Sequence, residues 1–499
     1  MTINQINDLT DKRINEILSA KDQLVIVGTT YFVANDGNDS NDGKTPKTAW
    51  QTFEKVSSAD LKVGDGVLFN RGDVFRGFLK TKPGVSYGAY GVGDKPKFYG
   101  WDKSLADKEL WELVDRFNSV YRLKEDILDC GVLVFNDGEY HSYKQIPSYI
   151  NGKFVCRDDE SVEFDIKKHL THDLDIVCFC DRRFTNRPTH GQDFPVPLMD
   201  EQCYGTLYLK CDRGNPGEVF HSIEAAPRRN LVQISNNKDV TIDNICIKYA
   251  GAHAIGAYLH TVGLTVTNCE IGWIGGSTQN FLGDDPNYPQ GGRGTVVRFG
   301  NGIEIYGGCE NYTVKNNYIY QCYDAGITHQ FTTNSETVKM TGIRYTDNVV
   351  ENCVYSIEYF LEKKGTDKHT DDNGSCMDDM VMSGNILRLS GYGWGQQRHN
   401  KNTPAHIKGW SYENTASNYI IKNNIFDRAK FKVLHLVARK ESSLPILEGN
   451  TYLQELGADL GLYGANEVKE PEIITFDKDI EQKLASVVKE TGAKIYFVK

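Results

Sequence analysis

The amino-acid sequence predicts an all-β fold, a right-handed parallel β-helix in which the chain winds into stacked coils of short strands. Glycine (47 residues), tyrosine (27) and phenylalanine (22) are abundant and proline (14) is sparse, a composition that favours short strands and turns over a helical bundle. Similar segments recur from about residue 240 onward, and the shortest interval between them is 24 residues. Two or three short strands in a turn of ~24 residues form one coil of such a solenoid.

Each repeat begins with a turn centred on asparagine, a residue that tolerates the left-handed backbone conformation. These turn residues are Asn244, Asn268, Asn316, Asn348, Asn385 and Asn424. A second strand follows several of the turns, at residues 254–258, 326–330, 356–360 and 431–436. Leucine-rich repeats have a similar period, but their leucine consensus and their helix are absent from this sequence.

The chain divides into five predicted parts. We expect an N-terminal helical cap (1–30), the first β-helix coils (31–100), an inserted β-sandwich-like domain of antiparallel strands (101–225), the main parallel β-helix with a groove (226–455) and a C-terminal cap (456–499). In the last part, the helical spacing of four apolar residues predicts a helix over the final coil: Ile480, Leu484, Val487 and Val488. Segments 275–300, 362–380 and 391–405 are expected to be loops that crowd one side of the solenoid.

Alternation of side chains along the second strands predicts which residues face inward. The expected inward ladder is Ile255, Ile303, Ile327, Ile357, Ile407 and Val433, and the residues that follow face outward: Gly256, Glu304, Thr328, Glu358, Lys408 and Leu434. This register places Glu304 and Glu358 in one outer column, two coils apart, with Thr328 between them. Their backbones would be about 10 Å apart, because stacked coils are separated by roughly 4.8 Å. Asp324 stands at the turn that enters the middle coil.

Paired carboxylates around a glycosidic bond are what glycoside hydrolysis requires, one as acid and one as base or nucleophile. The candidate catalytic residues are therefore Glu304, Asp324 and Glu358, and Asp371 and Asp372 are reserve carboxylates. The candidate substrate-binding residues are aromatic or polar: Arg298, Tyr306, Thr328, His329, Gln330, Trp394, His406, Lys408 and Trp410. His329 faces inward in the predicted register, so we expect it to be a core or orienting residue and not the base. The loops also carry Trp273, Arg293 and Arg398.

Composition and motifs exclude several kinds of partner. A formal net charge of -11 disfavours nucleic acid and anionic membranes as partners. The 12 cysteines form no CxxC pair or zinc-finger spacing, so we expect reduced, mostly buried thiols, no metal and no cofactor. The Asp-rich "DGNDSNDG" lacks the final Glu of a calcium loop. The first residues lack an apolar signal segment, so we expect a cytoplasmic protein, although a mature secreted form would look the same.

Several longer segments resemble β-helix carbohydrate-active enzymes of the pectate-lyase-like fold, most closely glycoside hydrolase family 141. The resemblance covers roughly residues 30–450 and lies in "SIEAAPRRNLVQI", "VTIDNICIKYAGAHAIG", "CEIGWIGGS" and "GNGIEIYGGCENYTVKNNYIYQCYDAGITHQ". It implies acid/base cleavage of plant or host glycans, since both fucosidases and xylanases belong to that family. It also implies that Glu304 in "GNGIEI" and Asp324 in "YDAGITHQ" are catalytic, whereas Glu358 comes from the register alone.

Two other functions compete with hydrolysis of an oligosaccharide or polysaccharide. A lyase or epimerase acting on uronic-acid glycans would need a cation to neutralise a carboxylate and a base, roles open to Lys408, Arg298 and His406. A non-catalytic, glycan-binding solenoid is the second alternative, although its coils would be more uniform than these. The linkage, the stereochemical course and the oligomeric state are left open by the sequence.

Overall fold

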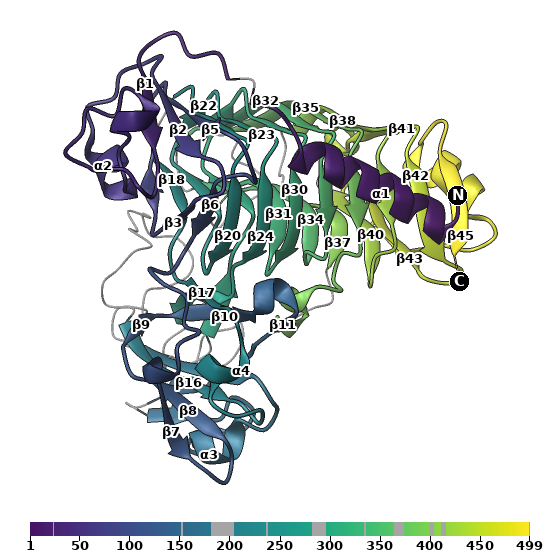
Figure 1. Ribbon diagram of the computed structural model, residues 1–499. Helices are drawn as coiled ribbons and strands as arrows, with labels where there is room; N and C mark the ends of the chain where they lie inside the picture. The colour runs from purple at the N-terminus through teal and green to yellow at the C-terminus, as the bar shows by residue number, and fades with distance from the viewer. Residues whose placement is uncertain are drawn as a thin grey trace.

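The protein is a right-handed parallel β-helix, as the sequence predicts, with an inserted β-domain and a helix at its C-terminal end (Figure 1). The computed structural model describes residues 1–22, 24–150, 153–180, 204–235, 238–281, 296–333, 336–363, 374–398, 404–410 and 416–498. Successive coils contribute one strand to each of three long sheets, here called A, B and C, and neighbouring strands within a sheet run parallel.

Sheet A contains twelve strands. Its main path is β1 (Thr30–Val33), β2 (Gly66–Asn70), β5 (Ser86–Tyr90), β19 (Thr241–Asp243), β23 (Thr265–Thr267), β29 (Thr313–Lys315), β32 (Lys339–Thr346), β35 (Cys376–Ser383), β38 (Ala416–Lys422) and β41 (Ile446–Glu448), with β22 (Thr261–Val262) and β28 (Cys309–Glu310) beside it.

Sheet B contains ten strands, and each of the first nine follows a strand of sheet A. They are β3 (Val74–Arg76), β6 (Lys97–Tyr99), β20 (Cys246–Ala250), β24 (Glu270–Ile274), β30 (Tyr318–Cys322), β33 (Val349–Glu351), β36 (Ile386–Arg388), β39 (Ile425–Asp427), β42 (Thr451–Glu455) and β45 (Lys494–Val498).

Sheet C carries the predicted site and also contains ten strands. They are β4 (Leu79–Lys80), β18 (Val232–Ser235), β21 (Ile255–Tyr258), β27 (Ile303–Tyr306), β31 (Ala325–Thr333), β34 (Tyr355–Lys363), β37 (Ala405–Trp410), β40 (Lys432–Ala438), β43 (Asp459–Ala465) and β44 (Ile474–Thr475). Only β44 in this sheet pairs antiparallel.

The predicted inward ladder of sheet C is confirmed for five of its six members. Cα pairing joins Ile255, Ile303, Ile327, Ile357 and Ile407 in one continuous column inside the solenoid. The sixth member is wrong by one residue: Ile407 pairs with Leu434, so His435 and not Leu434 follows Lys408 in the outer column. Val433 and Leu434 are both fully buried apolar residues, and a pattern of apolarity alone could not choose between them.

A ladder of side-chain amides runs through the interior at the turn between sheets A and B. Its members are Asn317, Asn348, Asn385, Asn424 and Asn450. Each Oδ1 accepts the backbone N–H and the side-chain N–H of the preceding member, and each Nδ2 donates to a backbone carbonyl. The buried turns thereby keep their polar groups hydrogen-bonded in every coil.

The recurring asparagines of the sequence occupy two adjacent turn positions with different tasks. Asn244, Asn268 and Asn316 adopt a positive φ, the conformation that asparagine tolerates better than most residues. Asn348, Asn385 and Asn424 belong to the amide ladder, and the positive φ in those coils falls one residue earlier, at Asp347, Gly384 and Asn423. The sequence analysis therefore treated two adjacent turn positions, the one with a positive φ and the one in the amide ladder, as a single position.

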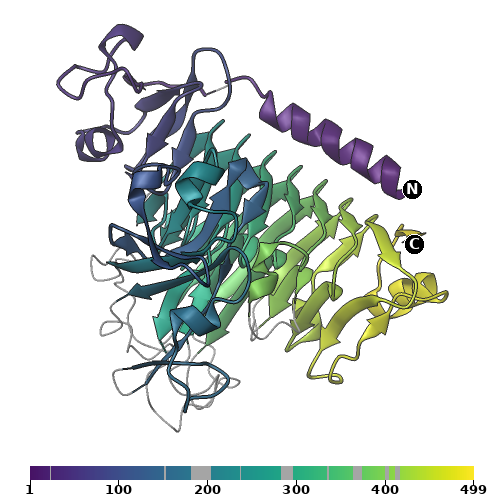
Figure 2. The same ribbon diagram turned by 60° about the horizontal axis from the view of Figure 1, so that its bottom comes forward.

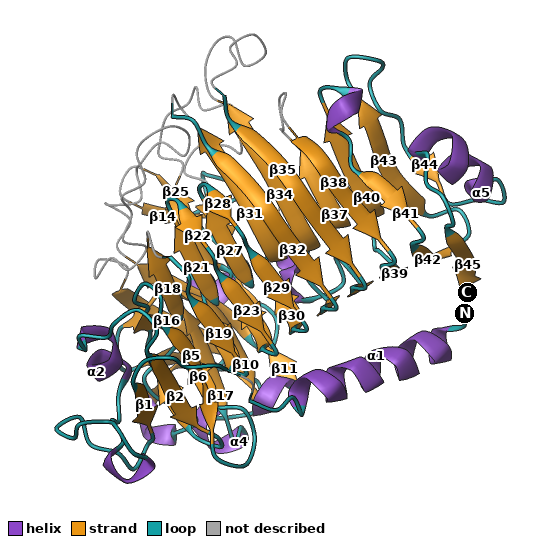
Figure 3. Ribbon diagram, turned by 90° about the horizontal axis from the view of Figure 1, so that it is seen from above, coloured by secondary structure: helices purple, strands orange, loops and turns teal. Residues whose placement is uncertain are grey.

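Residues 1–30 were expected to cap one end of the solenoid, but helix α1 (Ile3–Leu18) lies along its side instead (Figures 2 and 3). A capping box between Thr2 and Gln5 begins the helix, and its apolar face, with Ile6 and Ile17, packs on the outside of sheet B. That surface is an outward column of apolar residues from successive coils: Tyr318, Val349, Ile386 and Ile425.

Short helices cover both ends of the coil stack. At the N-terminal end, α2 (Phe53–Ser58) inserts Phe53 among the rings of Phe69, Phe75 and Phe98. At the other end lie α5 (Ile480–Lys483) and the π-helical turn Leu484–Val488. Ile480, Leu484 and Val488 are buried against the last coil as predicted, whereas Val487 is 47% exposed.

The inserted domain leaves the solenoid after β6, at the edge where sheet B turns into sheet C (Figure 1). Its elements are β7 (Trp111–Asp115), β8 (Val120–Leu123), β9 (Ile127–Leu128), β10 (Cys130–Phe135), β11 (Tyr140–His141), β12 (Tyr143–Lys144), β13 (Ser148–Ile150), β14 (Lys153–Val155), α3 (Ile166–His169), β15 (Asp175–Cys180), β16 (Tyr204–Lys210), α4 (Pro216–Val219) and β17 (Ile223–Pro227). Its pairings are antiparallel except that of β12 with β15, and its two main sheets share one core.

The loops of the coils widen the wall that this domain makes. The hairpin of β25 (Ser277–Phe281) and β26 (Val296–Phe299) and the 3-10 turn η5 (Trp394–Gln397) also leave at the B–C edge. The third expected loop, between β34 and β35, lies mostly outside the described residues, which end at Lys363 and resume at Gly374. The described parts of the other two expected loops leave on the same side of sheet C.

Two further expectations concern the whole chain. The cysteines that the structure describes are free thiols, and most of them are buried. No described helix combines the length and the apolarity needed to cross a membrane.

Candidate active site

The predicted catalytic column exists on the outer face of sheet C. Thr328 pairs with Glu358, and Glu358 pairs with Lys408, while the neighbouring pairs Ile303–Ile327 and Tyr306–Gln330 bring Glu304 into the same column. Glu304 and Glu358 therefore lie on the same side of the molecule, two coils apart, as the sequence predicts.

Glu304 is a buried carboxylate, 2% exposed, held by three neighbouring side chains. Its Oε2 accepts hydrogen bonds from Asn301 Nδ2 at 2.7 Å and from the Thr328 hydroxyl, and its Oε1 accepts one from Gln330 Nε2 at 2.9 Å. Burial raises the pKa of Glu304 to about 7, against the lowering effect of these donors. Near neutral pH this group can therefore hold a proton or release it.

Glu358 lies beside a cation and an indole N–H. Lys408 Nζ is 2.8 Å from its Oε1, and Trp410 Nε1 donates to the same oxygen at 3.0 Å. Burial disfavours the charged form of Lys408, but the Glu358 carboxylate outweighs it and raises the pKa of the ammonium. The two donors fix the orientation of the Glu358 carboxyl group.

Asp324 forms an ion pair with Arg398, which follows η5 at the B–C edge. The backbone carbonyl of Asp324 accepts the N–H groups of Val354 and Tyr355 at 3.0 and 3.1 Å, which fixes the turn that enters β31. Burial raises the pKa of the Asp324 carboxyl, and the negative charge of Glu358 acts in the same direction against the guanidinium.

Glu358 electrostatically couples the three carboxylates. Its charge contributes to the raised pKa of both Glu304 and Asp324, after the larger effect of burial. The ring of Tyr355 lies under this group, with its centroid 4.3 Å from Lys408 Nζ and 5.8 Å from the Arg398 guanidinium. Three acids and two cations thus share one partly desolvated surface, on which burial raises the pKa of two of the acids, Glu304 and Asp324.

A second outer column, two residues further along each strand, is aromatic. Cα pairing joins Tyr258, Tyr306, Gln330, Phe360 and Trp410 across successive coils. The rings of Phe360 and Trp410 lie 4.5 Å apart between centroids. Gln330 Oε1 is buried without a hydrogen-bond partner in the part of the chain that the structure describes. Apolar rings beside an unfilled acceptor match a sugar, whose faces are apolar and whose rim carries hydroxyl donors.

The two histidines predicted to bind substrate lie inside the solenoid, so this prediction is wrong for both. His329 faces inward as its register indicated: its ring nitrogens are 2.8 and 3.0 Å from the hydroxyls of Tyr345 and Tyr419. His406, expected to face outward, is fully buried and stacks near Phe426 of the core, so the strand does not alternate regularly at its start. Burial lowers the pKa of His329 to about 3 and of His406 to about 4.

Arg298 and Trp394 do not face the carboxylate cluster, as the prediction of substrate contacts there requires, because both are buried where the inserted domain meets the coils. Arg298 donates to the backbone carbonyls of Gly276 and Gly131, and its guanidinium lies 4.3 Å from the ring centroid of Tyr323. Trp394 is 1% exposed and donates to a backbone carbonyl of β30. The loop position of these residues was predicted correctly, but loop residues can also fasten one domain to another.

Five of the predicted substrate contacts face the carboxylate cluster: Tyr306, Thr328, Gln330, Lys408 and Trp410. Arg293, Asp371 and Asp372 lie outside the described residues. Trp273 packs under the inserted domain beside His141.

Sequence reasoning missed residues that orient the acids. Asn301 holds Glu304, and its own backbone N–H donates to His253 Nδ1 at 3.0 Å. Arg398 was noted in a loop but not assigned to Asp324, and Tyr355 was not noted. The sequence carried one signal: Asn301 and Tyr355 stand three residues before Glu304 and Glu358, respectively.

Among the residues that the structure describes, no three His, Cys, Asp or Glu side chains come together in a way that could hold a metal ion. Of the described histidines near the cluster, His329 points into the solenoid, whereas His435 follows Lys408 in the outer column. Burial, together with the charges of Lys408 and Lys432, lowers the pKa of His435 to about 4.

Comparison with known proteins gives likenesses of structure alone. No protein-family model matches the chain, so membership of glycoside hydrolase family 141 stays a prediction, and no curated protein sequence matches it. The chain is similar to the structure described as XylC in complex with xylose, at 12% identity and a TM-score of 0.35, covering 94% of this chain and 83% of the other.

Two other solved structures are similar to this chain over most of their own lengths. A GH136 lacto-N-biosidase from Eubacterium ramulus is 12% identical with a TM-score of 0.38, covering 99% of this chain and 70% of the other. A polygalacturonase from Erwinia carotovora ssp. carotovora is 11% identical with a TM-score of 0.26, covering 96% of both chains. At such identities and TM-scores, these likenesses carry nothing about what this chain acts on.

Proposed function

We propose that the protein is a glycoside hydrolase that cleaves an oligosaccharide or polysaccharide on the outer face of sheet C. One observation carries the proposal: a buried carboxyl with a pKa of about 7, Glu304, lies in the same column as Glu358, whose oxygen accepts from a lysine and a tryptophan. Two carboxyl groups, one that donates a proton and one that acts as base or nucleophile, are the requirement for cleaving a glycosidic bond.

The roles follow from these environments. Glu304, the group that holds its proton toward neutral pH, donates it to the departing glycosidic oxygen. Glu358, which lies beside Lys408 and Trp410, either attacks the sugar carbon as a nucleophile or removes a proton from the attacking water. Asp324, beside Arg398, is the third carboxyl and takes the same part as Glu358 if the sugar lies closer to β31.

The surroundings support a sugar as the substrate. The Phe360 and Trp410 rings offer apolar surface beside Glu358. The resemblance of "GNGIEI" and "YDAGITHQ" to glycoside hydrolase family 141 supports the same reaction class.

A lyase or epimerase acting on a uronic-acid glycan is the second candidate, because two cations, Lys408 and Arg398, are present at the site. Each of them is already paired with a carboxylate, which weakens its use as a neutralising group. His406, expected to be available as the base, lies inside the solenoid.

The test is a screen of aryl glycosides and of plant and host oligosaccharides, followed by amide variants on the substrate that responds. Glu304→Gln, Asp324→Asn and Glu358→Gln are compared with Glu310→Gln, a control on the same coil that lies away from the cluster. Loss of one essential acid or base lowers kcat by about 10²- to 10⁴-fold.

The pH profile and the product complete the test. The wild-type rate should fall as the pH rises through about 7, where Glu304 loses its proton. An unsaturated product that absorbs ultraviolet light would identify a lyase instead. Full activity after all three amide substitutions would contradict the proposed site, and a wild-type protein that binds glycans but cleaves none would favour a binding solenoid.

A further inference from the structure

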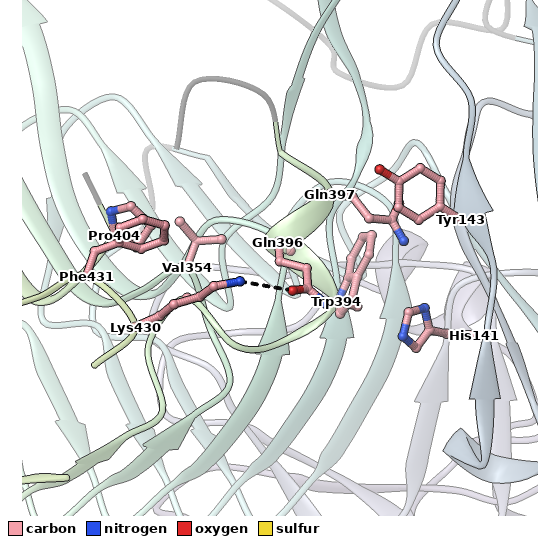
Figure 4. A pocket seen from close by; sticks show the side chains of 11 residues that line it. His141, Tyr143, Val354, Trp394, Gln396, Gln397, Pro404, Lys430 and Phe431 are labelled. Carbon is pink, nitrogen blue, oxygen red and sulfur yellow. Dashed lines mark hydrogen bonds between the residues drawn. The ribbon is translucent and has the colours of Figure 1, made fainter. Parts of the chain in front are cut away.

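A pocket of about 300 Å³ lies where the inserted domain meets the solenoid, beyond the carboxylate cluster (Figure 4). The inserted domain contributes His141 and Tyr143, η5 contributes Trp394 and Gln396, and the turn before β40 contributes Lys430 and Phe431. Its volume is at the lower end of the range of about 300–1,000 Å³ found for small-molecule sites. It therefore suits one small ring and not a long chain.

The pocket adjoins the proposed catalytic groups through the backbone. Gln397, in its wall, is followed by Arg398, the partner of Asp324. Val354, on another side, donates its N–H to the Asp324 carbonyl at 3.0 Å. A glycan bound along sheet C could extend over this edge and place another of its sugar units in the pocket.

The pocket combines aromatic rings with a cation. Lys430 Nζ donates to Gln396 Oε1 at 3.2 Å, and Figure 4 shows this side chain reaching across the pocket. Among the ion pairs of the described residues, none involves Lys430. Phe431 and Tyr143 supply partly exposed rings. This set differs from the carboxylate cluster, where every cation already has its anion.

Two more lysines lie on strands next to the pocket: Lys408 in β37 and Lys432 at the start of β40. After burial, their charges lower the pKa of His435 to about 4, while Glu358 acts in the opposite direction. Lys430 lies two residues before Lys432. In a chain with a formal net charge of -11, such a cluster is a local feature that favours an anion at this edge.

We infer that this pocket binds a carboxylate-bearing sugar unit of the substrate, a uronate, with its carboxylate beside Lys430 and its ring against Phe431. The inference rests on the proposed function, since it places the uronate next to the bond that is cleaved. It adds a substrate class, acidic glycans, that the carboxylate cluster alone does not define.

The first experiment measures binding and needs no turnover. Glucuronate and galacturonate are titrated against the protein by calorimetry or ligand-observed NMR, with glucose, galactose and acetate as arms that lack the carboxylate or the ring. Both uronates should bind more tightly than any of the three. Lys430→Met keeps an apolar stem and should weaken uronate binding three- to tenfold, a modest loss because the ammonium is exposed, while Lys440→Met should change nothing.

Phe431→Ala separates the ring contact from the charge: it should weaken the binding of glucose and of glucuronate by similar factors. Uronates that bind no better than acetate, or bind Lys430→Met as tightly as wild type, overturn the inference. The Glu304→Gln protein is titrated in parallel, because its pocket should stay intact. If the enzyme cleaves glycans but Lys430→Met binds uronates as tightly as wild type, only the uronate pocket is refuted. If uronate binding depends on Lys430 but the protein cleaves no glycan, only the proposed hydrolase function is refuted.

Discussion

The ionisation of Glu304 should make the stability of the folded protein depend on pH, and Glu304→Gln should remove that dependence. The rise of its pKa from 4.5 to about 7 means that the folded state holds this proton more tightly than the unfolded chain does. The resulting stabilisation is complete below pH 4.5 and is lost as the pH rises through about 7. Glutamine carries no charge at any pH, so it does not share this loss.

The magnitude follows from the two pKa values. Between pH 5 and pH 8, the free energy of unfolding of Glu304→Gln relative to wild type should increase by about 2.5 kcal/mol. Any hydrogen-bond cost of the new amide is the same at both pH values and cancels in this difference. Gln330 can accommodate the change, because rotation of its amide would turn the unpartnered Oε1 toward the new donor.

The assay is urea-induced unfolding of both proteins at the two pH values, followed by circular dichroism and tryptophan fluorescence. Glu470→Gln, an exposed residue between β43 and β44, serves as the matched control and should show no such shift. An equal difference between variant and wild type at pH 5 and pH 8 would refute the argument that burial holds a proton on Glu304.

Three further predictions concern other parts of the molecule. Arg398→Met leaves Asp324 without its cation, so the protein should lose about 2 kcal/mol of stability and the acid limb of its pH–rate profile should move to higher pH; an unmoved limb would exclude a role for this pair in catalysis. Asn385→Ala removes the partners of Asn348 and of the Tyr345 carbonyl, and should cost about 3 kcal/mol in urea unfolding. Ile6→Asp should release α1 to limited proteolysis while the circular dichroism of the coils persists, and unchanged protection would show that α1 is held elsewhere.

The sequence predicts the solenoid well because its strands repeat a physical constraint in every coil. Ile303, Ile327 and Ile357 must all face inward. Glu304 follows Ile303 and Glu358 follows Ile357, so both glutamates must face outward and lie in one column. The prediction was wrong at Leu434, where two adjacent apolar residues satisfy the same pattern. Periodicity specifies a register only where one face alone is apolar.

The contacts of the site could be predicted only in part, because many depend on where loops return. Arg298 and Trp394 stand in segments that leave the coils, and such a segment can border a substrate or fasten a neighbouring domain. The position of the inserted domain determines which of the two roles such a segment has. No local sequence pattern predicts how this domain packs against the solenoid. His406 was assigned to the wrong face because the start of its strand departs from regular alternation.

The side-mounted helix α1 has a consequence for how the chain folds during synthesis. Asn7 and Arg13 bind Arg388 and Asp347, which lie 381 and 334 residues further along the chain and are therefore made later. A lone helix of 16 residues is only marginally stable in water, so this segment has nothing to order it until those late windings exist. Protection of the first twenty residues from a protease would therefore report, from the opposite end of the polypeptide, that winding has been completed.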